Sequence, residues 1–295
     1  MRRVLIVAIL LSFTTFPITA GSSEETTVQR GVVFGGASIA ANDTGAVELA
    51  FAELPEIAED YTATWCDNCV YVEEALHDVA AQRNAEIIYF HRNNDVEDPF
   101  GSESGEAWWT RRYDAGIPPT IVFNGEEIQA GSIAEGASLK DDFTAKYPRG
   151  FELGNGDSQF IWTAGQGPAD GAFAWSLQYD SKQELFAQAS AVHSWLFILE
   201  DSAHFAEGSN GVEDYVHVVH EIIDLGFASE GVANITLPQA WDDDDLTLML
   251  IHEIEVFEEE PIPVQDDGGF LPAIGLLATM SMLILAATRR RQSSD

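Results

Sequence analysis

Residues 57–79 read IAEDYTATWCDNCVYVEEALHDV, and the spacing of the hydrophobic residues in this stretch changes at the two cysteines. Before the cysteines, residues 59–63 predict a short strand. After them, residues at spacings of three and four share one helical face, which predicts a helix from about Asp67 to Gln82. The residues on that face are Cys69, Val72, Leu76 and Val79. The first half of the chain is therefore expected to contain a strand that passes into a helix at a Cys-x-x-Cys pair.

The cysteine pair lies where dithiol chemistry is favourable. Free backbone N–H groups and the positive end of the helix dipole stabilise a thiolate, and CxxC motifs lower the pKa of the first cysteine below about 8.5. Cys66 is therefore the expected nucleophile, and Cys69, one turn later, is placed to resolve a mixed disulfide. Because the chain contains only 2 cysteines, the predicted disulfide is Cys66–Cys69.

Two other interpretations of the pair stay open. Zinc sites generally need four ligands, and no second cysteine pair or nearby HxxxH motif is present. A purely structural disulfide is a second alternative, but the loop that it would close is short and so contributes little stabilisation.

Further strands and a helix are expected up to residue 148. Residues 87–90 form a continuous apolar run, as in a central strand covered on both faces. Another strand covers residues 120–123, and Asn124-Gly125 is a strong hairpin signal. A last helix begins near Ser138, whose spacing to Asp141 fits a capping box, and ends at Pro148.

Residues 57–148 resemble the thioredoxin superfamily. Asp60 lies six residues before Cys66, and Trp65 occupies an aromatic position beside the active site. The resemblance implies an α/β thioredoxin-like fold over residues 46–150. It also implies that Asp60 helps to deprotonate the resolving thiol and that Trp65 shields the site.

The segment Gly116-Ile117-Pro118-Pro119-Thr120 resembles the cis-proline loop of the same family. The resemblance implies that Pro119 is the cis residue and that Pro119 and Thr120 hold the client backbone. Pro118 departs from the family pattern because it has no N–H to offer. The polar stretch from Arg92 to Gly105 is a second departure, and it is a candidate rim over the active site.

Residues 151–257 change to period-2 segments separated by Gly, Asp and Asn clusters, which predicts an antiparallel β-sandwich. Two segments, residues 197–201 and 215–219, resemble the Omp28-like surface proteins. That resemblance implies a binding or spacer role for this all-β part, with no chemistry attached.

Three further groups of side chains have two interpretations each. Residues 108–113 contain two Trp, two Arg and a Tyr, which could grip a client or simply pack. Residues 242–245 are all Asp and could bind calcium, but they lack the Gly and distal Glu of an EF-hand, which favours a solvated turn. His217 and His220 are expected to point to opposite faces of a strand, so shared metal ligation is not expected.

The two ends of the chain predict export and a membrane anchor. Residues 1–20 have the layout of a secretory signal peptide, with an uncleaved anchor as the alternative, and residues 21–45 read as a flexible leader or a poorly defined first strand. Residues 258–269 read as an acidic, proline-containing stalk, and 270–288 as a single transmembrane helix. A basic tail, 289–295, follows and places the body outside. The tail also resembles archaeal surface-protein sorting signals, which leaves its processing open.

Composition limits the partners. The formal net charge is −35, and such an acidic surface repels nucleic-acid phosphates and anionic lipid, so no nucleic-acid partner is expected. No cofactor and no metal are expected. The expected partners are exported proteins with thiols or disulfides, a membrane electron carrier, and the membrane itself through the C-terminal helix.

The sequence therefore predicts a membrane-anchored, extracytoplasmic thiol–disulfide oxidoreductase, with its redox direction open. The alternative from another class is a surface binding or adhesion protein that keeps a disulfide without turnover. A third is a thiol carrier for copper or haem maturation.

Overall fold

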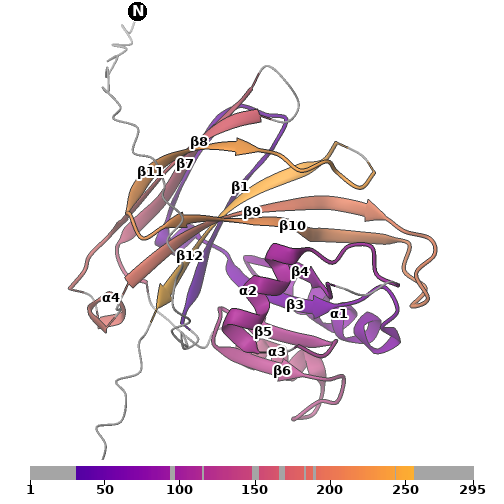
Figure 1. The fold of residues 1–295 in the computed structure, drawn as a ribbon. Coiled ribbons are helices and arrows are strands. Elements are labelled where there is room, and N and C mark those ends of the chain that lie inside the picture. Colours follow the sequence, from indigo (N-terminus) through magenta and orange to yellow (C-terminus); the bar gives the residue numbers. More distant parts are fainter. Residues whose placement is uncertain are drawn as a thin grey trace, which may run out of the picture. The chain divides into compact units, whose positions relative to one another are not determined.

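The computed structural model of the chain describes residues 31–93, 97–114, 116–147, 153–165, 170–182, 184–188, 191–242 and 244–255. The chain divides into two compact units, Met1–Phe257 and Glu258–Asp295. All of the described residues belong to the first unit, and strands predominate in it (Figure 1).

The larger sheet is mixed and has eight strands in the order β1-β12-β9-β10-β4-β3-β5-β6. Strand β4 pairs in parallel with β3 on one side and with β10 on the other, the latter at Val218 and Tyr89. The other pairs are antiparallel. The strands are β1 (Val33–Ala40), β3 (Glu56–Thr62), β4 (Ala85–His91), β5 (Thr120–Phe123), β6 (Glu127–Ala130), β9 (Ala191–His204), β10 (Asp214–Gly226) and β12 (Leu246–Glu255).

The smaller sheet is antiparallel, with four strands in the order β11-β8-β7-β2. Aromatic residues on β7 and β8, among them Phe160 and Phe173, form a buried cluster with Leu196 and Leu248 of β9 and β12. This cluster packs the smaller sheet on one face of the larger one. The strands are β2 (Gly45–Ala50), β7 (Gly156–Ala164), β8 (Asp170–Tyr179) and β11 (Glu230–Thr236).

Local sequence explains where the three longest described helices begin. Cys66, Ser102 and Ser138 are their N-caps, and each side chain accepts a hydrogen bond from the backbone N–H three residues later. Helix α1 buries the face that the sequence predicted, from Cys69 to Val79. The helical elements are η1 (Phe51–Glu53), α1 (Asp67–Ala80), α2 (Glu103–Tyr113), α3 (Leu139–Lys146) and α4 (Glu184–Gln188).

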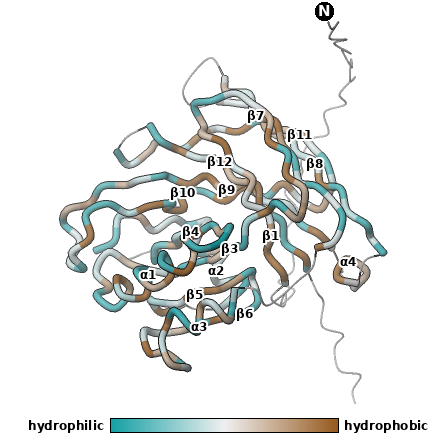
Figure 2. The backbone as a smooth tube through the Cα atoms, turned by 180° about the vertical axis from the view of Figure 1, so that it is seen from behind, coloured by the Kyte–Doolittle hydropathy of each residue, from teal (hydrophilic) through white to brown (hydrophobic). Residues whose placement is uncertain are grey.

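Helices cover both faces of the larger sheet around β3 and β4. Val72 and Leu76 of α1 and Phe143 of α3 pack with Tyr89 on one face. Trp108 and Trp109 of α2 lie in a second cluster with Phe90. Hydrophobic stretches alternate with polar ones along the strands (Figure 2). The continuous apolar run 87–90 is therefore buried on both faces, as predicted.

The expected fold class is wrong. The sequence predicted an α/β thioredoxin-like fold, then a separate all-β antiparallel sandwich and a single C-terminal transmembrane helix. Instead, β3–β6 share one sheet with β1, β9, β10 and β12. In a separate thioredoxin-like unit, one edge of β4 would leave backbone groups unpaired, and here β10 pairs with that edge. Strand β1 and the first residue of β2 lie within 21–45, the segment expected to be a flexible leader or a poorly defined first strand.

Among the described residues, no helix has the length and apolar character needed to cross a membrane. The expected signal peptide (1–20), stalk (258–269), transmembrane helix (270–288) and basic tail (289–295) lie outside the described residues.

His252 of β12 links the two sheets. Its Nε2 lies 2.8 Å from Ser158 Oγ on β7 and its Nδ1 lies 2.9 Å from Ser194 Oγ on β9. Burial lowers the pKa of His252 from its ordinary 6.5 to about 3. The folded protein therefore keeps this imidazole neutral where the unfolded chain protonates it.

The titration of His252 predicts acid sensitivity. From pH 6.5 downward, the unfolded chain binds the extra proton, so the free energy of unfolding falls by up to about 1.4 kcal/mol per pH unit. The variant His252→Gln keeps polar atoms between the serines but does not titrate, so we expect a shallower fall. Urea unfolding at several pH values between 7 and 4 measures it, and equal slopes in both proteins would contradict the prediction.

Candidate functional site

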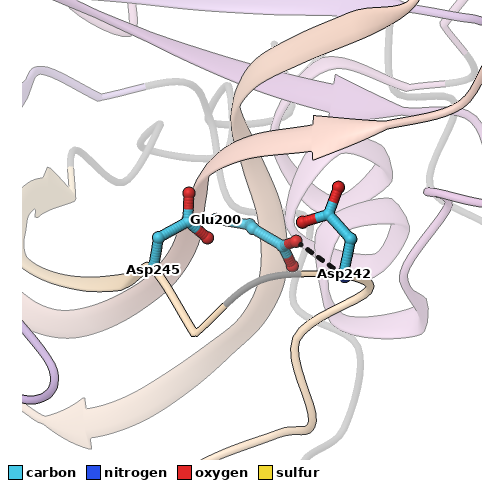
Figure 3. Close-up of side chains that lie close together, drawn as sticks. All are labelled: Glu200, Asp242 and Asp245. Carbon is cyan, nitrogen blue, oxygen red and sulfur yellow. Dashed lines mark hydrogen bonds between the residues drawn. The ribbon is translucent and has the colours of Figure 1, made fainter.

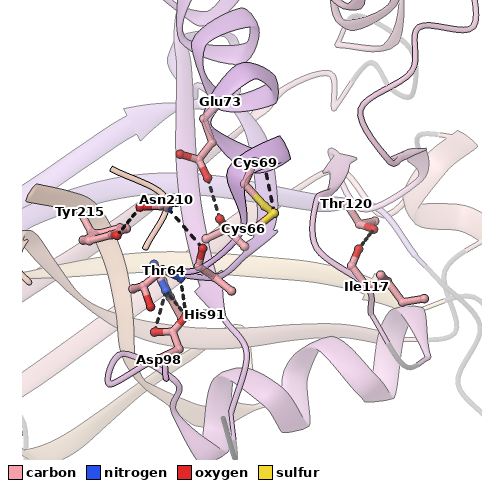
Figure 4. Close-up of a disulfide and its surroundings, with 12 residues drawn as sticks. Thr64, Cys66, Cys69, Glu73, His91, Asp98, Ile117, Thr120, Asn210 and Tyr215 are labelled. Carbon is pink, nitrogen blue, oxygen red and sulfur yellow. Dashed lines mark hydrogen bonds and ion pairs between the residues drawn. A yellow bond between two sulfur atoms is a disulfide. The ribbon is translucent and has the colours of Figure 1, made fainter. Parts of the chain in front are cut away.

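The two cysteines form a disulfide at the start of α1, as predicted (Figure 4). The sulfur atoms are 2.03 Å apart and the Cα atoms 5.3 Å apart. Cys66 is the N-cap, and its Sγ accepts a hydrogen bond of 3.2 Å from the backbone N–H of Cys69. The helix dipole therefore acts on Cys66 Sγ.

The two cysteines are both buried. Cys69 has an exposed fraction of 0% and Cys66 one of 5%. Trp65 is partly buried and packs against the cysteines and Ala63. Trp65 therefore covers part of the pair.

The proline loop runs from the same end of the sheet as the cysteines. Tyr61 near the end of β3 pairs with Thr120 at the start of β5, so residues 63–66 and 116–119 leave neighbouring strands at one edge. The bond between Pro118 and Pro119 is cis, as predicted. Thr120 Oγ1 donates a hydrogen bond of 2.8 Å to the Ile117 carbonyl, and both residues lie in the surroundings of the disulfide (Figure 4).

Ile117 is the exposed side chain of this loop, at 78%, whereas Pro119 and Thr120 are buried. A partner that approaches the loop therefore meets Ile117 first. The predicted binding residues Pro119 and Thr120 can offer it mainly backbone groups.

Asp60 lies on β3 and is fully buried. Within the described part of the chain, neither of its carboxylate oxygens has a hydrogen-bond partner. Burial raises the pKa of Asp60 well above its ordinary value, and the negative charge of Glu73 raises it further. The structure therefore places a protonatable acid in the strand that leads into the cysteine pair.

Glu73 is a residue that the sequence reasoning missed. It lies on α1 four residues after Cys69, and its Oε1 accepts a hydrogen bond of 2.6 Å from Thr62 Oγ1. The spacing of four was a usable signal, because residues at i and i+4 share a helix face. Only its electrostatic link to Asp60 on the neighbouring strand β3 required the structure.

His91 and Asp98 were also missed. Both are buried, and His91 Nδ1 lies 2.9 Å from Asp98 Oδ2, which also accepts a 3.0 Å hydrogen bond from the Thr64 N–H (Figure 4). Thr64 Oγ1 donates to the Glu97 carbonyl. Asp98 lies in the stretch 92–105, expected as a rim over the active site. Its side chain instead anchors the segment before the cysteines.

Asn210, from the connection between β9 and β10, holds the same segment from the other side. Its backbone N–H donates to the Thr64 carbonyl at 3.2 Å, and its Oδ1 accepts from Tyr215 Oη at 2.8 Å. Part of the support for the cysteine segment therefore comes from the second half of the chain.

The aromatic and basic group at residues 108–113 faces inward. Trp108 and Trp109 are buried, and Trp108 Nε1 donates to Glu59 at 2.6 Å. Arg112 is buried against Glu253 of β12. These contacts match the packing interpretation of the group and leave little of it to grip a client.

Three acidic side chains, Glu200, Asp242 and Asp245, lie close together (Figure 3). Glu200 accepts from the backbone N–H groups of Trp241 and Asp242, and Asp245 from that of Ser202. Burial raises the pKa of Glu200 to about 7. These contacts fit the turn interpretation of residues 242–245, because much of the cluster holds backbone amides.

The two histidines, His217 and His220, have different partners. His220 Nε2 contacts Glu200, whereas His217 Nδ1 lies 3.2 Å from the Ile87 carbonyl. Burial lowers the pKa of His220 to about 4.

Comparison with known proteins does not place the chain in a family. No family model matches it, and no curated protein matches it. Among solved structures, a crystal structure of a protein from Agrobacterium tumefaciens is similar, with 14% sequence identity and a TM-score of 0.39. The match covers 61% of this chain and 78% of that one. A likeness at this level carries no functional argument.

Proposed function

We propose that the protein exchanges disulfides with client proteins through Cys66 and Cys69. The observation that carries the proposal is the disulfide at the N-cap of α1, with Cys66 as the capping residue. A disulfide whose first sulfur leaves or attacks as a thiolate gains from a helix N-terminus. The local likeness of residues 57–148 to the thioredoxin superfamily supports the same chemistry.

The exchange balances without a further reactant. One client thiolate attacks Cys66 Sγ, the Cys66–Cys69 bond breaks, and Cys69 leaves as a thiolate that takes up a proton. The second client thiolate then attacks the client sulfur of the mixed disulfide and displaces Cys66. The client dithiol is oxidised to a disulfide and the cysteine pair is reduced to a dithiol. The reverse sequence reduces a client disulfide.

Other residues have supporting roles in this proposal. Asp60 exchanges the proton of Cys69, Trp65 limits water at the pair, and Pro119 and Thr120 present backbone groups to the client. Pro118 lacks an N–H, so the client backbone is held through fewer hydrogen bonds at this loop.

The proposed location of the protein follows from its disulfide. Disulfides persist in oxidising compartments outside the cytoplasm, so the clients are exported proteins with thiols or disulfides. We place the body outside the cytoplasm, with a membrane electron carrier restoring the pair.

The test is insulin reduction with dithiothreitol as the electron source. We expect the wild-type protein to accelerate insulin precipitation, and Cys66→Ser to return the rate to that of dithiothreitol alone, because no nucleophile remains at the helix start. In a separate reaction without dithiothreitol, reduced Cys69→Ser protein should form a mixed disulfide between Cys66 and insulin that persists, because no resolving thiol remains, and it is visible on a non-reducing gel.

Near-ultraviolet circular dichroism controls for folding of the variants. If the wild type does not accelerate the reaction, or Cys66→Ser matches it, the exchange proposal is wrong and the surface-binding alternative gains support.

A further inference from the structure

A cavity of about 210 Å³ lies beside α1. Glu73 of α1 and Thr62 of β3 line it, together with Tyr89 of β4. Glu73 is partly exposed, whereas Asp60 is fully buried. Solvent in this cavity therefore reaches Glu73 but not Asp60.

Strand geometry places Asp60 next to these cavity residues. Side chains at i and i+2 of a strand point to the same face, so Asp60 and Thr62 share the face that α1 covers. Tyr89 is the partner of Asp60 in the β3–β4 register. Glu73, held by Thr62 Oγ1, belongs to the same group.

Helix geometry connects Glu73 to the cysteines. Cys69 and Glu73 are four residues apart on α1 and so lie on one side of the helix. Cys69 is fully buried at the start of the helix. Glu73 therefore lies one turn further along, toward the cavity.

We propose that Glu73 relays protons between the buried Asp60 and the solvent of this cavity while Cys69 enters or leaves the disulfide. The inference rests on the proposed exchange chemistry and adds the route of its proton. Asp60 gives a proton to the departing Cys69 thiolate, takes one from Glu73, and Glu73 takes one from water in the cavity. In the reverse direction the thiol proton follows the same path outward.

The relay has a physical reason. Asp60 has no hydrogen-bond partner among the described residues, so nothing stabilises its charge while it waits for a proton. Burial and the negative charge of Glu73 raise the pKa of Asp60, so Asp60 holds its proton until the Cys69 thiolate takes it. Thr62 fixes the orientation of Glu73. Glu73 in turn acts on Cys69 only through Asp60, so Glu73 is a positioning residue.

Other titratable groups surround Asp60 and Glu73 and contribute to the pH dependence of the reaction. They are Glu74 and His77 on α1, Tyr89 and His91 on β4, Asp98 beside His91, Tyr147 after α3, and Asp214 and Tyr215 on β10.

The test is the reduction of the Cys66–Cys69 disulfide in the full-length protein by dithiothreitol from pH 5 to 9, with rates expressed per dithiothreitol thiolate. We expect Glu73→Gln to lower the rate about tenfold at pH 7, because positioned proton transfer contributes substantially to such steps. It should also move the ionisation of Asp60 to lower pH, because the Glu73 charge that raises the pKa of Asp60 is lost. Glu73→Asp should recover part of the rate.

Asp78→Asn is the matched control, since Asp78 lies on the same helix but is exposed and does not line the cavity, and it should keep the wild-type profile. Thr62→Val provides a second route if Glu73→Gln fails to fold, and we expect it to slow the reaction less. Identical profiles for the Glu73 and Asp78 variants would overturn the relay. This measurement needs no protein client, so the relay can fail while insulin reduction succeeds, and the reverse.

Discussion

Replacing Arg112 with methionine is expected to lower the free energy of unfolding by about 3–5 kcal/mol. The Arg112 side chain is 1% exposed and contacts Glu253, whose side chain is 0% exposed. Arg112 also donates a 2.7 Å hydrogen bond to the Gly31 carbonyl. Removal of the guanidinium leaves the buried Glu253 carboxylate with less positive charge beside it. It also leaves the Gly31 carbonyl without the hydrogen bond from Arg112. Urea or thermal unfolding at pH 7 measures the change.

Arg111 provides the matched comparison. Its Nη2 lies 2.6 Å from the same Glu253 carboxylate, but its side chain is 28% exposed. Arg111→Met should therefore cost less, about 1 kcal/mol, because water screens this contact. The double variant Arg112→Met/Glu253→Met removes the buried charge and should recover much of the loss. If Arg112→Met cost no more than Arg111→Met, burial would not be the deciding factor.

Replacing Asp60 with alanine is expected to raise the free energy of unfolding by about 1–3 kcal/mol at pH 8. The folded protein holds this carboxyl with a raised pKa because of its burial and the nearby Glu73 charge. Below pH 3.8 the carboxyl is protonated in both the folded and the unfolded state, so its burial costs no charge. As the pH rises toward the folded pKa, the unfolded chain releases this proton first, so Asp60 increasingly lowers the free energy of unfolding. The gain from the variant should therefore grow with pH and be small at pH 4.

Urea unfolding of Asp60→Ala and of the wild type at pH 4, 6 and 8 tests whether the gain in the free energy of unfolding grows with pH. Asp43→Ala removes an exposed carboxyl and serves as the control, with no comparable trend expected. A stability gain for Asp60→Ala that did not change with pH would show that the loss of the charge is not its cause. The same variant should also slow reduction of the disulfide, because the proposed proton donor is absent.

Local signals predicted several elements well. The spacing of Cys69, Val72 and Leu76 placed α1 within two residues of its observed end. The Asn124-Gly125 pair predicted the β5–β6 hairpin, because both residues adopt the positive φ that such a turn needs, 49° and 79°. Ser138 predicted the start of α3.

The union of the two halves could not be predicted from periodicity. A period-2 pattern indicates a strand and which residues share a face, but it does not choose the neighbouring strand. The parallel pairing of β10 with β4 is registered at Val218 and Tyr89, two residues 129 positions apart in the chain. The hydrophobic packing of Trp108 against Phe197 likewise joins segments far apart in the sequence.

The residues of the candidate site also fall into those that the sequence could predict and those that it could not. Cys66, Cys69 and the cis Pro119 follow from motifs at fixed spacing. Asp98 and Asn210, which hold the segment before the cysteines, carry no motif, and each becomes visible only through a hydrogen bond to Thr64.

The pairing of β1 with β12 has a consequence for how the chain is made. Val33 lies opposite Glu253, so the first described strand can pair only after the last one has been synthesised. Until some 250 residues have emerged, β1 has no β-ladder partner, and residues 33–40 are presented to chaperones or to other nascent chains. Contacts between such distant segments form slowly, so completion of the larger sheet follows synthesis of the whole domain.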